Sequence, residues 1–114
     1  MPENCIFCKI VAGEAPAEIV YQDELVTAFQ DIHRQAPTHI LLAPNQHVTS
    51  VNEVAAEHGA ALARLFSAAR LLAEQEGIHE SGYRLVVNTG GEGGQSVFHL
   101  HMHLLGGRQM RALG

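Results

Sequence analysis

The chain has 114 residues, of which 46% are hydrophobic but only 5% aromatic, with no tryptophan. A chain of this length predicts one domain, residues 1–114, with a core of Ala, Leu, Val and Ile. The formal net charge of −5 argues against nucleic acid or an anionic membrane as partner. Because no apolar run approaches the ~20 residues of a membrane span and the N-terminus lacks a signal-peptide pattern, we expect a cytoplasmic protein.

The first half of the chain predicts a short helix and three strands. Residues 1–18 predict a helical turn followed by a loop. The segments "EIVYQD" (18–23) and "ELVTAFQD" (24–31) predict two strands joined by a tight turn. "DIHRQAPTH" (31–39) is a loop, and the continuous apolar run "HILLAP" (39–44) predicts a buried strand.

The second half predicts one long helix between sheet segments. "SVNE" (50–53) fits a capping box, and a helix is expected from Val54 to Glu76, with Gly77 ending it. Apolar residues at steps of three and four predict its core face: Leu62, Leu65, Phe66, Ala69 and Leu72.

Two further strands are predicted near the C-terminus. They are "YRLVVN" (83–88) and "SVFHLHMHLLG" (96–106), with the glycine-rich turn "TGGEGGQ" (89–95) between them. Sheet segments on both sides of one long helix predict an α+β fold with a mainly antiparallel sheet. One helix cannot cover both faces of that sheet, so we expect a homodimer.

Three histidines in the last predicted strand, His99, His101 and His103, alternate with apolar residues. On a strand, side chains two positions apart face the same way, with neighbours roughly 7 Å apart and the outer pair about 13 Å apart. All three cannot easily close on one zinc, whose nitrogen ligands lie about 2.0–2.1 Å from the metal, although two with a distant ligand could. A solvated strand face and ordinary core packing are the alternatives without function.

Imidazoles beside a glycine turn suit phosphate chemistry without a metal. Histidine acts as nucleophile, acid or base near neutral pH, and the turn offers backbone N–H groups to an anion. Residues 85–107 contain no Lys or Arg, which favours a single, lightly charged phosphate. Attack by His101 on phosphorus would form a phosphorus–nitrogen bond, so a phosphoramidate is a suitable substrate.

The segment "HLHMHLL" (99–105) matches the pattern His-φ-His-φ-His-φ-φ, where φ is hydrophobic. "GGQSVFHLHMHLLGGRQM" (93–110) resembles the nucleotide-binding branch of the histidine triad (HIT) family, whose members are purine nucleoside phosphoramidases. "DIHRQAPTHILLAP" and "YRLVVN" also occur in family order, so the similarity runs from about Cys5 to Met110. The resemblance implies a dimer whose sheets join into one ten-stranded sheet, and a purine nucleotide (AMP or GMP derivative) as substrate.

The resemblance also implies site residues. His101 would be the nucleophile that forms a nucleotidyl-histidine, with its other ring nitrogen held by a backbone carbonyl. His103 would contact the α-phosphate, and His99 and His39 would complete a four-histidine site. Asp31 falls on the residue that binds the ribose hydroxyls. The phosphate and ribose contacts map to Asn88, Gly94, Gln95, Ser96 and Val97, and the apolar slot for the base maps to Ile6, Phe7, Ile10, Phe29 and Ile32, for which core packing is the alternative.

The chain departs from the family pattern at two places. His33-Arg34 stands where Ser-Pro or Asn-Pro is usual, and the chain ends at "RALG" where relatives carry a Trp-Pro-Pro-like tail. His103, which a transferase branch replaces by Gln, favours hydrolysis.

Cys5 and Cys8 form a single Cys-x-x-Cys pair. Two thiolates need two more ligands for a tetrahedral zinc, and the resemblance offers His47 and His99. Such a closed shell would be structural, and catalysis would need no cofactor. The alternative is a pair of reduced cysteines beside apolar residues.

Three other functions remain open at this point. One is hydrolysis of dinucleoside polyphosphates. The second is a nucleotide- or zinc-binding interaction module without catalysis. The third is a metalloenzyme that uses the histidines as ligands.

Overall fold

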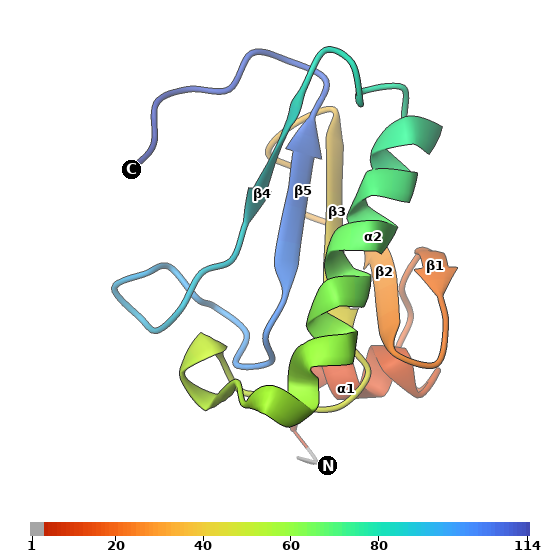
Figure 1. Ribbon diagram of the computed structural model, residues 1–114, viewed down its shortest axis with the longest axis vertical. Coiled ribbons are helices and arrows are strands. Elements are labelled where there is room, and N and C mark those ends of the chain that lie inside the picture. The colour runs from red at the N-terminus through yellow and green to blue at the C-terminus, as the bar shows by residue number, and fades with distance from the viewer. Residues whose placement is uncertain (1–3) are drawn as a thin grey trace.

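The computed structural model describes residues 4–114 as a five-stranded antiparallel sheet with one long helix and one short helix (Figure 1). The predicted α+β class is confirmed. The elements in chain order are α1 (Ile6–Val11), β1 (Ile19–Gln22), β2 (Val26–Gln30), β3 (Thr38–Pro44), α2 (Gly59–Gln75), β4 (Tyr83–Val86) and β5 (Met102–Gly106). The sheet order is β1-β2-β3-β5-β4, which leaves β1 and β4 at the edges.

The main core lies between α2 and one face of the sheet. Strand β3 contributes Ile40 and Leu42, and β5 contributes Met102 and Leu104, all at most 2% exposed. They pack against the small-residue face of α2, which includes Ala69 at 0% exposure. The alanines let the helix approach the sheet closely, so the core needs few aromatic residues.

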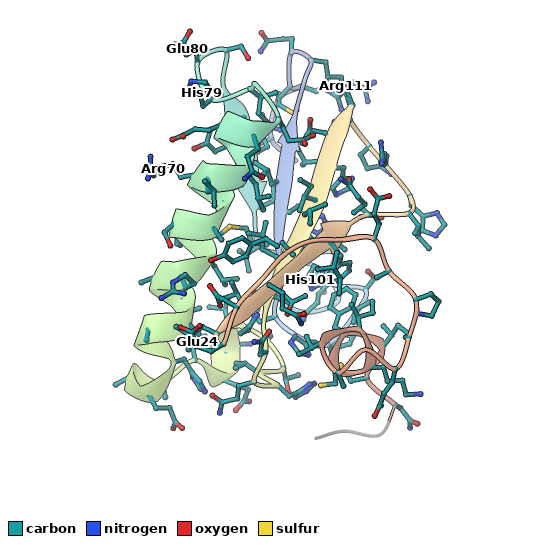
Figure 2. The ribbon with its side chains drawn as sticks, turned by 90° about the vertical axis from the view of Figure 1, so that its right-hand side faces the viewer. Glu24, Arg70, His79, Glu80, His101 and Arg111 are labelled. Atoms are coloured by element: carbon teal, nitrogen blue, oxygen red, sulfur yellow. The ribbon has the colours of Figure 1, made fainter. Side chains whose placement is uncertain are left out.

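A second apolar cluster lies on the opposite face of the sheet, under α1. Phe7 and Ile10 of α1 pack with Phe29 of β2 and Leu41 of β3. In the side view of Figure 2, α2 lies on the left and α1 at the lower right. Because side chains alternate along a strand, His39 and Leu41 of β3 and His103 of β5 share this second face.

The turn between β1 and β2 is fixed by Asp23. Its Oδ1 accepts the N–H groups of Leu25 and Val26, and its Oδ2 accepts Tyr21 Oη–H at 2.6 Å and Arg64 Nη1–H at 2.6 Å. Burial opposes ionisation of Asp23, but these hydrogen bonds outweigh it and hold the pKa of the carboxyl well below its usual range. The ion pair with Arg64 ties α2 to this edge of the sheet.

Three predictions about these elements are wrong. The last strand begins at Met102 rather than Ser96, so only His103 of the three histidines lies on β5. The long helix begins at Gly59 rather than Val54, after two 3₁₀ turns. Phe66, expected on the core face, is 59% exposed because its position on α2 points away from the sheet.

None of the helices within residues 4–114 has the length and apolar content needed to cross a bilayer.

Candidate functional site

His101 precedes β5 directly and is held in one tautomer by the backbone. Its Nδ1 lies 2.8 Å from the carbonyl oxygen of His99, so Nδ1 carries the proton and donates it, and Nε2 carries the lone pair. Phe7 packs edge-on against the ring, with centroids 4.9 Å apart. Burial lowers the pKa of His101, although the carbonyl partner opposes this effect. The ring is therefore neutral at pH 7 with a free nucleophilic nitrogen.

His39 and His103 form a hydrogen-bonded pair beside Asp31. The N–H of Gln35 donates to His39 Nδ1 at 3.0 Å, so the proton of the neutral His39 ring is on Nε2. That Nε2 lies 2.9 Å from His103 Nδ1 and 3.2 Å from Asp31 Oδ2. His103 Nδ1 is thus an acceptor, which places the proton of His103 on Nε2.

Both rings of this pair are neutral at pH 7. Burial, with smaller contributions from His101 and His39, lowers the pKa of His103 to about 4. Burial also lowers the pKa of His39, although Asp31 opposes that shift. His103 therefore offers a neutral N–H donor.

The ring of His99 is turned away from His101 and His103. Its Nε2–H donates to the carbonyl oxygen of Pro44 at 2.8 Å, and its Nδ1 faces Cys5 Sγ at 3.3 Å and Cys8 Sγ at 3.5 Å. The His99 side chain therefore faces the cysteines rather than His101, and its part in the four-histidine site stays a prediction. His99 serves that row through its carbonyl group, which orients His101.

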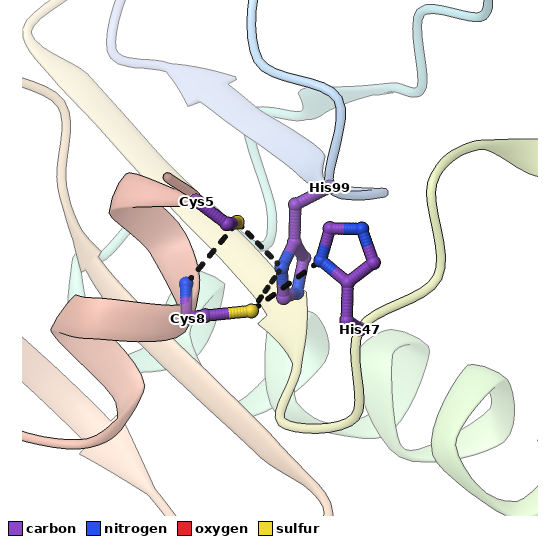
Figure 3. A group of neighbouring side chains, drawn as sticks. All are labelled: Cys5, Cys8, His47 and His99. Carbon is purple, nitrogen blue, oxygen red and sulfur yellow. Dashed lines mark hydrogen bonds between the residues drawn. The ribbon is translucent and has the colours of Figure 1, made fainter. Parts of the chain in front are cut away.

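Cys5, Cys8, His47 and His99 converge on one point (Figure 3). Their donor atoms all lie within 4.8 Å of one another, and Cys8 Sγ lies 3.3 Å from His47 Nδ1. A tetrahedral zinc, with bonds of about 2.3 Å to sulfur and 2.0–2.1 Å to nitrogen, places its ligands about 3.6 Å apart. The Pro44 carbonyl fixes the His99 tautomer that points a lone pair inward. The group therefore fits a closed Cys₂His₂ zinc site.

A second cluster, Asp31, His39 and His103, also brings three potential ligand atoms together. It does not fit a metal ion. A metal bound at His39 Nε2 would need a lone pair there, whereas the Gln35 N–H at Nδ1 requires the Nε2–H tautomer. The cluster is a hydrogen-bonded chain instead.

The predicted base-binding residues line one cavity of about 360 Å³ on the α1 face of the sheet. Ile6 and Ile32 are 45% and 87% exposed at its rim, so core packing does not account for them. Asp31 lies at the same cavity, and its Oδ1 accepts the N–H of His33 at 2.7 Å. The predicted residues that line the cavity are Ile6, Phe7, Ile10, Phe29, Asp31, Ile32 and Val97.

The glycine-rich segment is held by Gln95, whose side chain is buried. Gln95 Nε2 donates to the carbonyls of Thr49 at 2.8 Å and Val97 at 3.1 Å, and Oε1 accepts the N–H of Gly90 at 2.9 Å. Both amide hydrogens are used within the protein. The side chain therefore holds the loop, and a contact of Gln95 with phosphate or ribose stays a prediction.

The remaining predicted phosphate contacts are divided between two places. Asn88 Nδ2 donates to the Gly93 carbonyl at 2.7 Å, and Gly94 adopts a φ of +87° beside it. Ser96 lines a different cavity, of about 510 Å³, together with Cys5 and His47. The structure therefore does not bring Ser96 to the apolar cavity.

Sequence reasoning missed several backbone groups that set the site. The carbonyl of Pro44 orients His99, the N–H of Gln35 orients His39, and the carbonyl of Thr49 anchors Gln95. Every residue carries such groups, so residue type offers no signal for them. Only the fold reveals which of them face His39, His99 or Gln95.

The HIT domain family matches residues 12–110 of the chain. The chain belongs to the histidine triad family. It is 59% identical to the purine nucleoside phosphoramidase of Escherichia coli K12 over 110 residues, covering 96% of this chain and 92% of the relative. It is 50% identical to a 14 kDa zinc-binding protein of Zea mays, covering 92% and 83% of the two chains.

Solved structures of the HIT family share the fold. A HIT family hydrolase from Legionella pneumophila superposes with a TM-score of 0.93 at 50% identity, covering 95% of this chain and 96% of that one. A zinc-bound histidine triad family protein from Mycobacterium smegmatis gives a TM-score of 0.79 at 32% identity, covering 92% and 76%. The predicted family is thereby confirmed.

Proposed function

We propose that this HIT-family chain hydrolyses the phosphorus–nitrogen bond of purine nucleoside 5'-phosphoramidates. The observation that carries the proposal is the hydrogen bond from His101 Nδ1–H to the His99 carbonyl, which leaves Nε2 free. The high identity to a purine nucleoside phosphoramidase supports the substrate class. The cavity beside Phe7, which also packs on His101, provides an apolar slot for the base.

The reaction has two displacements at phosphorus. The Nε2 lone pair of His101 attacks, a P–Nε2 bond forms, the bond to the leaving amine breaks, and the amine departs with a proton taken from solvent. The oxygen of a water then attacks phosphorus, the P–Nε2 bond breaks, and a nucleoside monophosphate leaves while the water returns one proton to solvent. Because the first step exchanges one P–N bond for another, the intermediate is close in energy to the substrate.

Other residues hold the substrate in this proposal. His103 donates its neutral Nε2–H to a phosphate oxygen, and His39 keeps that proton in place. The Asp31 carboxylate has lone pairs to spare beyond its bonds to His33 and His39, so it accepts the ribose hydroxyls. Asn88 and Gly94 shape the glycine-rich loop proposed to lie beside the phosphate, since Asn88 Nδ2 donates to the Gly93 carbonyl.

We also propose that Cys5, Cys8, His47 and His99 bind a structural zinc ion and that catalysis needs no metal. Four protein ligands would leave no open position for water. The zinc would stabilise the segment before His101 by fixing His99, whose carbonyl orients the nucleophile. Cysteines arranged as metal ligands also suit the reducing cytoplasm, where we place the protein.

We further propose a homodimer joined at the β4 edges. The unpaired edge of β4 is available for pairing with a second copy, and exposed apolar residues on α2, Phe66 and Leu71, favour a covered surface. Two sheets joined in this way form the ten-stranded sheet that the resemblance implies.

Steady-state turnover of two substrates tests the proposed function. The wild-type chain should hydrolyse an adenosine phosphoramidate faster than a diadenosine polyphosphate. His101→Gly should lower phosphoramidate turnover about 10⁴-fold or more, while His79→Gln, which changes an exposed histidine outside the site, should not. Faster polyphosphate cleavage would favour a dinucleoside polyphosphate hydrolase. Unchanged turnover in His101→Gly would favour a binding module without catalysis.

A further inference from the structure

The chain after β5 runs directly across the loop that follows β2. Gly107 adopts a φ of +94°, and a Cβ built on it would lie 2.8 Å from Pro37 Cβ. A side chain at this position would therefore be strained by the backbone and would also collide with Pro37. The close approach brings the next residue, Arg108, to the same loop.

Arg108 is hydrogen-bonded to Gln35, and Gln35 is hydrogen-bonded to His39 of the site. Arg108 Nη2 donates to the Gln35 carbonyl at 2.7 Å, and the Gln35 N–H donates to His39 Nδ1 at 3.0 Å. The Gln35 side chain also donates to the His33 carbonyl at 3.3 Å. Gln35 is thus fixed on both sides, between the C-terminal segment and the histidine pair.

We propose that Gly107 and Arg108 form a C-terminal latch that positions the Gln35 N–H and thereby fixes the tautomer of His39. Arg108 acts as a positioning residue, because it reaches the reacting groups only through Gln35 and His39. This inference rests on the proposed function for its kinetic consequence. The tautomer that it predicts can be measured without a substrate.

The latch matters because the Gln35 N–H determines which nitrogen of His39, and then of His103, carries the proton. With Gln35 N–H at Nδ1, His39 donates from Nε2 to His103, and His103 keeps its proton on Nε2. Without that N–H, only Asp31 Oδ2, at 3.2 Å, favours the proton on His39 Nε2. Where the proton moves to Nδ1, two lone pairs face each other across 2.9 Å. His103 would relieve this repulsion by moving its own proton to Nδ1, and the donor proposed for the phosphate would be lost.

The matched pair Arg108→Ala and Arg111→Ala tests the latch. Both variants remove one positive charge from the C-terminal segment. The hydrogen bond of Arg111 is made by its backbone carbonyl, which accepts from Arg84, so the substitution of its side chain leaves that bond in place. We expect Arg108→Ala to lower kcat about three- to tenfold with little change in KM, because the lost donor acts mainly on the charge that develops at the phosphate in the transition state. Arg111→Ala should match wild type, and Arg108→Lys should restore part of kcat.

Imidazole ¹⁵N chemical shifts report the tautomer of His39 directly. They should not change if Arg108 only stabilises the fold. In folded Arg108→Ala, and in a second variant Gly107→Ala, the His39 signals should shift from the Nε2–H pattern toward Nδ1–H. Wild-type His39 shifts in both variants would overturn the proposal, as would a fall in kcat with no tautomer change. If wild type shows no phosphoramidase turnover, the ¹⁵N result still decides the latch separately from the proposed function.

Discussion

His103 links the histidine site to acid stability. Its folded-state pKa of about 4 lies below the ordinary value of 6.5, so the unfolded chain binds a proton that the folded chain excludes between these pH values. The free energy of unfolding should therefore fall as the pH drops from about 6.5 and level off near 4. We expect the fall in unfolding free energy between pH 7 and pH 4.5 to be about 2 kcal/mol smaller in His103→Gln than in wild type.

Urea denaturation at pH 7 and pH 4.5 measures this effect. The difference in unfolding free energy between the two pH values should be smaller in His103→Gln than in wild type. The control His79→Gln, at an exposed position, should keep the wild-type difference. The same pH dependence in His103→Gln and wild type would contradict the assigned burial effect.

Cys8 tests the proposed zinc. In the metal-free chain, burial, together with the neighbouring Cys5, raises the pKa of the Cys8 thiol to about 11, whereas a bound cation would favour the thiolate. Metal analysis should find about one zinc per chain in wild type and none in Cys8→Ser. We expect the variant to melt about 10 °C lower or more, since it loses the free energy of metal binding.

Turnover separates a structural from a catalytic zinc. At temperatures where Cys8→Ser remains folded, phosphoramidate hydrolysis should persist, although slowed by looser placement of His99. Complete loss of activity with an unchanged melting temperature would contradict a structural role.

At the level of single residues, the sequence predicts side-chain chemistry better than side-chain direction. The apolar slot and the Cys₂His₂ group assemble as the residue types and the family resemblance indicate. The direction of His99 could not be predicted, because it depends on the Pro44 carbonyl, a backbone group 55 positions away. The same holds for the Gln95 side chain, whose direction depends on the carbonyls of Thr49 and Val97.

At the level of elements, the histidine segment shows why a strand pattern can mislead. The apolar residues Leu100, Met102 and Leu104 do alternate into the core, as predicted. Strand pairing nevertheless begins only at Met102, because Leu100 N–H is already bonded to the Val48 carbonyl in a loop. Alternation reports which face is buried, and it does not report which backbone groups are paired.

The start of the long helix was mispredicted for a similar local reason. Ser50 Oγ accepts the Asn52 N–H, which closes a 3₁₀ turn rather than the capping box of an α-helix. Ala55 is extended, with a φ of −133°, and its N–H is taken by His58 Nδ1. The helix can therefore begin only after His58, although the apolar spacing alone extends further back.

Gln95 provides a prediction for the glycine loop. Gln95→Ala removes three hydrogen bonds from a buried side chain and leaves the Thr49 carbonyl and the Gly90 N–H without their partner. We expect a loss of about 2–4 kcal/mol in unfolding free energy, measured by denaturant titration. Gln109→Ala, which changes an exposed glutamine, is the control and should cost less than about 0.5 kcal/mol. An equal loss of unfolding free energy in the two variants would contradict the view that the Gln95 side chain stabilises the glycine-rich loop.

At the level of the whole molecule, the α+β class follows from a chain of short strands and one long helix, whereas the place of β5 between β3 and β4 is known only from the structure. Phe66 on α2 is 59% exposed in one copy, which leaves most of its ring available to a second copy. We expect Phe66→Glu to shift the protein from about twice its 12.3 kDa chain mass toward a single chain in sedimentation equilibrium. Ser67→Glu, the neighbouring exposed position, is the control for added charge. A wild-type chain that sediments as a monomer would contradict the proposed dimer.

The central claim is that Nε2 of His101 takes the nucleotidyl group during turnover. Base quenching in the first turnovers, followed by peptide mass spectrometry at alkaline pH, measures this most directly. The account predicts a nucleoside monophosphate on the peptide that contains His101, under conditions that preserve P–N bonds, and no such adduct in His101→Gly. An adduct on another residue during wild-type turnover would contradict the account. So would the absence of any adduct when single-turnover kinetics show that an intermediate accumulates.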